Sequence, residues 1–256
     1  MGAIEHDNLE EFQDPYLYDL EEDYYAPDGP FIEALARQTG GPLLDLACGT
    51  GRLAIPYARL GFAVTGVDLA LPMIEQARRK ATAARVEVRF VHDDARTARL
   101  GQQFGLAYMT GNAFQAFLTR ADQDALLATV VAHLRDDGRF VFGTRCPVPA
   151  HLDIDHEETV WNRYTAPDGR EIAVSGFQTY DPALQLQHWT TIRRWRDDKG
   201  EPVAWSTRIT LRYQTVDELI ALLGDNGLAV KQRYGSWDGD SYTAESQDVR
   251  FVCSKI

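Results

Sequence analysis

Short apolar runs alternate with segments of helical periodicity from residue 42 to residue 145, and this alternation constrains the fold more than any other feature. Each apolar run has the length of a buried strand, and apolar residues recur at helical spacing between the runs. This order is typical of a parallel sheet whose strands are connected by helices. The strands predicted in this region are residues 43–47, 63–68, 86–92, 106–109 and 139–144.

The pattern changes after Thr144, where Pro147 and Pro149 interrupt the chain. Four β-rich runs with turn residues between them then predict antiparallel strands at residues 159–165, 172–180, 186–195 and 203–213. Thr215 and Glu218 have the spacing of a capping box, which predicts a helix that ends at Gly227. Two final strands are predicted at residues 228–234 and 248–254.

These elements predict an α/β fold with a Rossmann-like, seven-stranded, doubly wound sheet and an antiparallel β insertion after the fifth strand. Residues 1–145 would form an amino-terminal cover, rich in tyrosine and acidic residues, and the cofactor-binding core. Residues 146–213 would form the insertion and cover the substrate, and residues 214–256 would complete the core.

Charge and composition exclude several classes of function. The 256-residue chain has a net charge of −12 and a pI near 4.9, which argues against a nucleic-acid partner. Arg193 and Arg194 form a local basic cluster with Arg196, but two aspartates follow, so we interpret the cluster as a solvated strand end.

Cysteine usage and hydropathy point to the cytoplasm. The three cysteines contain no close pair, so neither a disulfide framework nor a zinc site is indicated. The chain lacks both a signal-peptide pattern at its acidic amino terminus and an apolar run of roughly 18 to 20 residues that could span a membrane. We therefore expect a cytoplasmic protein without a membrane partner.

A glycine-rich turn follows the first predicted strand. Gly49 and Gly51 allow the backbone to turn sharply and to approach a ligand closely. With Ala54 they satisfy the G-x-G-x-x-A pattern of dinucleotide enzymes, so an NAD(P)-dependent oxidoreductase is one interpretation. Asp45, however, precedes the turn by four residues, where a carboxylate would repel a pyrophosphate. This acid favours a ligand with a cationic amino group and no phosphate.

Acidic residues also follow the second and third strands. Asp68 is placed to accept hydrogen bonds from ribose hydroxyls, and Asp94 is placed to accept one from an adenine amino group. Because parallel strands end at the same edge of a sheet, three acids after three successive strands predict a nucleoside site. This combination is more specific than any one of the acids.

Three segments resemble the first three motifs of class I S-adenosylmethionine (SAM) dependent methyltransferases, namely residues 43–51, 66–68 and 93–95. Residues 104–109 and the following Thr110-Gly111-Asn112-Ala113-Phe114 resemble the fourth. The resemblance implies that SAM is the cofactor, with Leu69 and Met73 near its adenosine and tyrosines over its methionine end. The residues expected to bind it are Tyr18, Tyr25, Asp45, Ala47, Gly49, Gly51, Arg52, Asp68, Leu69, Met73, Asp94, Ala95 and Met109.

The acceptor is expected to be a small molecule. Family members that methylate adenine or glutamine carry a proline-rich signature after the fourth strand, which residues 110–113 lack. N-methylation by direct displacement is the first expectation, because alignment of the reacting atoms can suffice for a neutral amine. O-methylation, the oxidoreductase and a noncatalytic SAM-binding module remain alternatives, and the β insertion could form a homodimer.

No catalytic residue can be assigned from the pattern, but several residues are candidates. Asn112, Gln115, His151 and His188 are the candidates for a catalytic role. The expected substrate contacts are Asn112, Phe114, Gln115, Trp189, Tyr213 and Trp237. A metal site is not expected, because His151 and His156 have neither a fixed helical spacing nor a cysteine partner.

Overall fold

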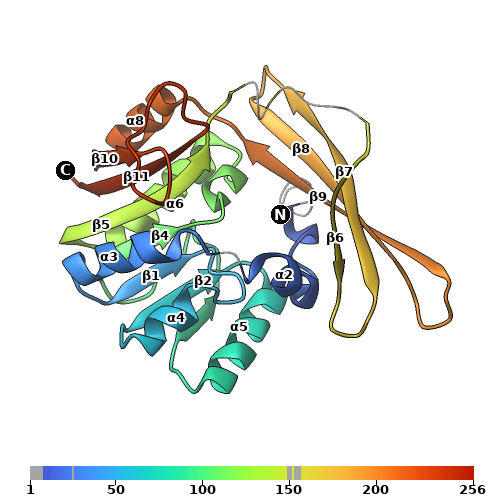
Figure 1. Cartoon of the computed structure of the whole chain (residues 1–256). Helices are drawn as coiled ribbons and strands as arrows, with labels where there is room; N and C mark the ends of the chain where they lie inside the picture. Colours follow the sequence, from blue (N-terminus) through green and yellow to red (C-terminus); the bar gives the residue numbers. More distant parts are fainter. Residues whose placement is uncertain (1–7, 25, 149–151, 153–156) are drawn as a thin grey trace.

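A seven-stranded sheet forms the core of the computed structural model, which describes residues 8–24, 26–148, 152 and 157–256. The strand order is β10-β11-β5-β4-β1-β2-β3, which confirms the predicted fold class (Figure 1). The strands β1 to β5 are parallel, and β11 is antiparallel to both of its neighbours. The strands are β1 (Leu43–Leu46), β2 (Val64–Asp68), β3 (Arg89–His92), β4 (Phe104–Met109), β5 (Leu134–Arg145), β10 (Leu228–Tyr234) and β11 (Asp248–Lys255).

Helices cover both faces of this sheet. The helices are α3 (Gly29–Thr39), α4 (Ala54–Arg59), α5 (Leu71–Ala84), α6 (Arg120–His133) and α8 (Val216–Asp225), with a short 3₁₀ helix η1 (Ala113–Ala116). Side chains alternate across a strand, so Tyr108 of β4 packs with α3, α4 and α5, whereas Met109 packs with α6 and α8. None of the helices in the described part of the chain is long and apolar enough to cross a membrane.

Two strands begin three or more residues away from their predicted positions. The strand β5 begins at Leu134, directly after α6, although the sequence predicted its start at Arg139. The acidic residues between these positions are exposed, which hides the strand pattern. The strand β3, which lies at the edge of the sheet, begins at Arg89 rather than Val86.

The predicted capping box of α8 is confirmed. The Thr215 hydroxyl accepts a hydrogen bond from the Glu218 N–H at 3.3 Å, and the Glu218 carboxylate accepts one from the Thr215 N–H at 2.7 Å. We expect Thr215→Ala to lower the free energy of unfolding by about 1 kcal/mol, because it exposes an unsatisfied helix-end N–H. Thermal unfolding should show a fall in Tm of about 2–4 °C. An unchanged Tm would contradict this role of the cap.

The insertion forms a separate antiparallel sheet in the order β6-β7-β8-β9. Its strands are β6 (Thr159–Thr165), β7 (Glu171–Asp181), β8 (Leu186–Arg196) and β9 (Pro202–Arg212). In β8, Gln187, Thr191 and Arg193 are buried, whereas His188 and Arg194 on the opposite face are exposed. Figure 1 shows this sheet standing beside the core, with one face turned toward it.

The helix α2 (Pro15–Glu22), which the sequence did not predict as a helix, lies between the core and the insertion sheet (Figure 1). On the side of the insertion, Leu17 packs against apolar residues of β6 and β7. One turn later Glu21 forms an ion pair with Arg193 at 2.7 Å, and Glu11 contacts the same guanidinium at 2.5 Å. Arg193 is only 4% exposed, so the interpretation of this arginine as part of a solvated strand end is wrong.

A second side of α2 contacts the core. Asp19 accepts hydrogen bonds from the Thr50 hydroxyl at 2.6 Å and the Lys80 ammonium at 2.9 Å. Asp23, one turn later, forms an ion pair with the same Lys80 at 2.8 Å. The helix is therefore fixed on one side to the insertion and on another to the core.

Candidate functional site

The glycine turn between β1 and α4 has a backbone that favours small residues. Gly49 and Gly51 have φ values of +54° and +82°, and Ala47 at the end of the strand has a φ of +58°. A Cβ on Gly51 would lie 3.0 Å from the ring of Phe90 and 3.1 Å from Ile55. The packing thus leaves the backbone as the only group that residue 51 can present at this turn.

Asp68 at the end of β2 holds this turn in place. One carboxylate oxygen accepts a hydrogen bond from the Gly49 N–H at 2.8 Å, and the other accepts one from the Ala70 N–H at 2.8 Å. Burial raises the pKa of Asp68, and these hydrogen bonds oppose that rise. Each oxygen keeps a second lone pair, which fits the predicted contact with ribose hydroxyls.

Asp45 lies beneath the turn and is 3% exposed. Burial raises its pKa to about 8, although Arg52 and Tyr108 both act in the opposite direction. An acid of this kind is mostly neutral in the free protein at pH 7. A cationic amino group nearby would favour its ionised form, so the site fits the methionine end of SAM.

We expect the binding of S-adenosylhomocysteine (SAH), which shares that amino group, to release a proton at pH 7. The affinity should rise as the pH increases toward about 8 and then level off, because Asp45 must ionise to pair with the ammonium. The free protein should instead lose stability over this range, since its folded state binds the proton more tightly than the unfolded chain does. Calorimetry in buffers of different ionisation enthalpy measures the proton release, which Asp45→Asn should remove.

Arg52 connects the turn to two other elements. Its guanidinium forms a bidentate pair with Asp28 at 2.7 Å for both contacts, and it donates to the Thr110 hydroxyl at 3.2 Å. Asp28 is 2% exposed and precedes α3. Asp28 was not among the predicted site residues, because its place before Gly29 and Pro30 indicated only the beginning of a helix.

The other residues expected to bind the cofactor lie after β2, after β3 and at the end of β4. Met73 and Met109 are fully buried, Ala95 is buried, and the Leu69 carbonyl oxygen lies 3.0 Å from His92 Nε2. Burial acts against ionisation of Asp94, but hydrogen bonds from Arg96, the closest at 2.6 Å, give a net lowering of its pKa. This pKa shift favours the ionised form of Asp94, and both of its oxygens accept hydrogen bonds from Arg96.

Tyr18 lies on a third side of α2, above the glycine turn. Its hydroxyl is 3.8 Å from the position that a Cβ on Gly49 would occupy, and burial raises its pKa. This position agrees with a tyrosine that covers the methionine end of SAM. Tyr25, the other predicted tyrosine, lies outside the described residues.

Two of the residues predicted to contact the methyl acceptor instead contact other parts of the protein. The Gln115 amide donates to the Arg212 carbonyl oxygen at 3.1 Å and accepts from the Arg145 N–H at 3.4 Å. Phe114 is 1% exposed and stacks on Phe142 at 4.5 Å between ring centroids. In the structure, Gln115 connects the core to the insertion, and Phe114 packs in the core.

Three other residues predicted to contact the methyl acceptor lie near Arg145 or at the beginning of η1. Trp189 and Tyr213 both lie near Arg145 at the end of β5, whose guanidinium is 5.5 Å from the Trp189 ring centroid. Asn112, with a φ of +57°, is half-buried at the beginning of η1. These residues lie at or beyond the carboxyl ends of β4 and β5, where parallel sheets bind ligands.

Of the three other residues predicted for the acceptor site, two lie away from Arg145 and one lies outside the described residues. Trp237 packs edge-on against Phe31 at 5.5 Å, beside β5. His188 is exposed on the outer face of β8 and contacts the Thr210 hydroxyl at 2.9 Å. His151 lies outside the described residues. Arg145 was missed, because a single arginine at the end of a strand carries no motif.

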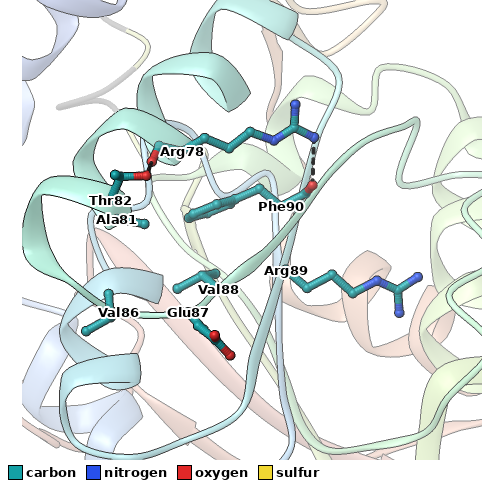
Figure 2. A pocket seen from close by; sticks show the side chains of 8 residues that line it. All are labelled: Arg78, Ala81, Thr82, Val86, Glu87, Val88, Arg89 and Phe90. Carbon is teal, nitrogen blue, oxygen red and sulfur yellow. Dashed lines mark hydrogen bonds between the residues drawn. The ribbon is translucent and has the colours of Figure 1, made fainter.

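A surface groove of about 450 Å³ lies between α5 and β3, away from the acids described above. Figure 2 shows Arg78 reaching across it to donate a hydrogen bond to the Phe90 carbonyl oxygen, at 2.9 Å. Glu87 is the only acid among its lining residues in the described part of the chain. The groove therefore lacks the carboxylates that a SAM site requires.

The region that holds the glycine turn and the three acids is similar to known proteins. Residues 43–138 match the family model described as a methyltransferase domain. The cypemycin N-terminal methyltransferase of Streptomyces sp. is 27% identical over 248 residues, which cover 93% of this chain and 94% of that protein. The oxidoreductase and the noncatalytic module are therefore not retained.

Solved structures share the complete fold. A SAM-dependent methyltransferase from Clostridium acetobutylicum has a TM-score of 0.80 at 15% identity, with 94% of this chain and 96% of that chain covered. A SAM-bound amino pentose methyltransferase from Micromonospora echinaspora has a TM-score of 0.72 at 21% identity, with 95% and 97% covered. The chain therefore carries a methyltransferase domain at residues 43–138, and nearly its whole length shares the fold of solved SAM-dependent methyltransferases.

Proposed function

We propose that this enzyme methylates an amine nitrogen of a small-molecule acceptor. The observation that carries the proposal is the position of the insertion sheet, which brings Trp189 to Arg145 at the end of β5 and joins β9 to Gln115. The acceptor would lie between this sheet and the glycine turn. A site between two sheets that contact each other would suit a compact acceptor better than a nucleic-acid duplex.

The relatives support nitrogen as the acceptor atom. The cypemycin enzyme, which is similar over nearly the whole length of both chains, is named as an N-terminal methyltransferase. An amino pentose methyltransferase shares the fold, including the region of the insertion. Both names describe acceptors that carry an amino group.

SAM supplies an electrophilic methyl group on a sulfonium, so the chain mainly has to position the acceptor and exclude water. Asp45, Asp68 and Asp94 would hold the amino, ribose and adenine groups of the cofactor. Tyr18 would cover the methionine end from α2. The acceptor nitrogen would then approach from the side of Arg145 and the insertion.

The proposal is tested with purified enzyme, SAM and a panel of acceptors. The panel contains amino acids, amino sugars and short peptides with free amino termini, together with phenols and other hydroxyl compounds as the O-methylation arm. Mass spectrometry should detect the gain of one or more methyl groups on an amine. Methylation confined to the hydroxyl compounds would overturn the proposal in favour of an O-methyltransferase.

A further inference from the structure

The acidic side chains in and directly after α2 differ in whether they form hydrogen bonds or ion pairs. Asp19 is bound to Thr50 and Lys80, Glu21 to Arg193, and Asp23 to Lys80. Glu22 forms no hydrogen bond or ion pair with the described residues, and its side chain is exposed. One carboxylate of this helix is therefore left available for a ligand.

The position of Glu22 on α2 places it on the side of the helix that meets the glycine turn. Residues four apart lie on the same side of a helix, so Glu22 shares the side of Tyr18, whose hydroxyl lies over Gly49. The two other sides of α2 are occupied by its contacts with the insertion and the core. Glu22 thus lies on the side of α2 that carries Tyr18, whose hydroxyl meets the glycine turn.

Charged groups from four elements act on Glu22. Although the residue as a whole is exposed, desolvation of its carboxyl group by the surrounding protein raises its pKa. The carboxylates of Glu21 and Glu11 raise this pKa further, and the guanidinium groups of Arg52 and Arg145 oppose the rise. Tyr18 on the same helix also interacts with it electrostatically. Arg52 belongs to the cofactor turn and Arg145 to the acceptor side, so Glu22 lies within the field of both.

We propose that Glu22 is the carboxylate that receives the ammonium group of the acceptor and takes a proton from it. This inference rests on the proposed N-methylation and specifies its substrate class, a primary or secondary amine that is cationic in solution. Asp45, buried below the turn, is the separate acid assigned to the amino group of the cofactor. The two acids lie on different elements and serve different nitrogens.

The proposed step balances in atoms and charge. The acceptor ammonium gives one N–H proton to the Glu22 carboxylate, which leaves a lone pair on the nitrogen. That lone pair forms the new N–C bond to the methyl carbon as the C–S bond breaks, and the electron pair of the broken bond stays on sulfur. The products are a methylated ammonium, the neutral thioether of SAH and a protonated Glu22, which returns its proton to water.

The test compares wild type with Glu22→Gln, using an amine that the wild type methylates. We expect kcat/KM of the variant to fall about 100-fold at neutral pH, which is the low end of the range for general-base catalysis. The difference should shrink as the pH rises toward the pKa of the acceptor, because the free amine then needs no base. The wild-type profile should show an inflection in acid, where Glu22 becomes protonated, whereas the variant profile should follow only the ionisation of the amine.

Binding measurements give a second readout. Calorimetry should show that Glu22→Gln weakens binding of the amine to the enzyme–SAH complex about tenfold, or roughly 1.4 kcal/mol, while the affinity for SAH alone stays unchanged. The matched control is Asp23→Asn, which removes the neighbouring charge on another side of the helix and leaves Lys80 paired with Asp19. It should keep the wild-type pH profile.

The possible failures are distinguishable. An equal loss of SAH affinity and rate in Glu22→Gln would assign the carboxylate to the cofactor and overturn the inference, while amine methylation by the wild type would still stand. An unchanged rate and pH profile in the variant would overturn it as well. Methylation of hydroxyl compounds alone by the wild type would overturn the proposed function and this inference together.

Discussion

Asp68→Ala is expected to lower the affinity for SAH by at least about 100-fold, which corresponds to roughly 3 kcal/mol. The substitution removes the expected acceptor for the ribose hydroxyls, and hydrogen bonds to a charged group contribute about 1.5–3 kcal/mol each. It also releases the Gly49 and Ala70 N–H groups, which Asp68 holds at 2.8 Å. Calorimetry with SAH measures the loss, and circular dichroism confirms that the variant is folded.

Two further variants make this result specific. Asp68→Asn keeps the size of the side chain but turns an NH₂ group toward one backbone N–H, so its affinity should lie between those of wild type and Asp68→Ala. Asp168→Ala removes an exposed carboxylate that pairs with Arg170 on the β6–β7 turn, and it should leave SAH binding unchanged. If Asp68→Ala binds SAH as wild type does, the assignment of the ribose site is wrong.

Arg193→Ala is expected to reduce the free energy of unfolding by about 3–5 kcal/mol, because it leaves the carboxylates of Glu11 and Glu21 partly buried without their cation. The side chain of Arg193 is 5% exposed, and those of the two glutamates are 18% and 13% exposed. For a chain of this length the Tm should fall by about 10 °C. Differential scanning calorimetry measures the change.

The adjacent arginine is the control. Arg194 pairs with Glu158 on the outer face of β8, where its side chain is 45% exposed, so Arg194→Ala should change the stability by less than about 1 kcal/mol. Equal effects of the two substitutions would show that the buried cluster contributes no more than a surface pair. Replacing Glu11 and Glu21 by glutamine in the Arg193→Ala background should restore part of the loss, because no unpaired charge then remains.

The core of the fold was predictable because its signals are local. The strand that contains Asp45, the glycine turn and the capping box at Thr215 each depend on residues within a few positions of one another. β-rich runs separated by turn residues likewise indicated the four strands of the insertion. The boundaries of β5 were missed where exposed charged residues replace the apolar pattern at the beginning of the strand.

The contacts of α2 could not be predicted from the sequence, because its partners are distant in the chain. Glu21 and Arg193 are separated by 172 residues, and Asp19 and Lys80 by 61. An acidic segment without a long apolar stripe gives no sign of which acid pairs with which base. The same limitation hid Glu22 and Arg145, whose proposed roles come from where the fold places them rather than from a motif.

The two-turn helix α2 joins three parts of the molecule. One side pairs with Arg193 of the insertion sheet, a second side pairs with Lys80 of α5, and a third places Tyr18 over the glycine turn. Because one short helix carries all three sets of contacts, a displacement of Tyr18 from the turn would also strain the ion pairs on the other two sides.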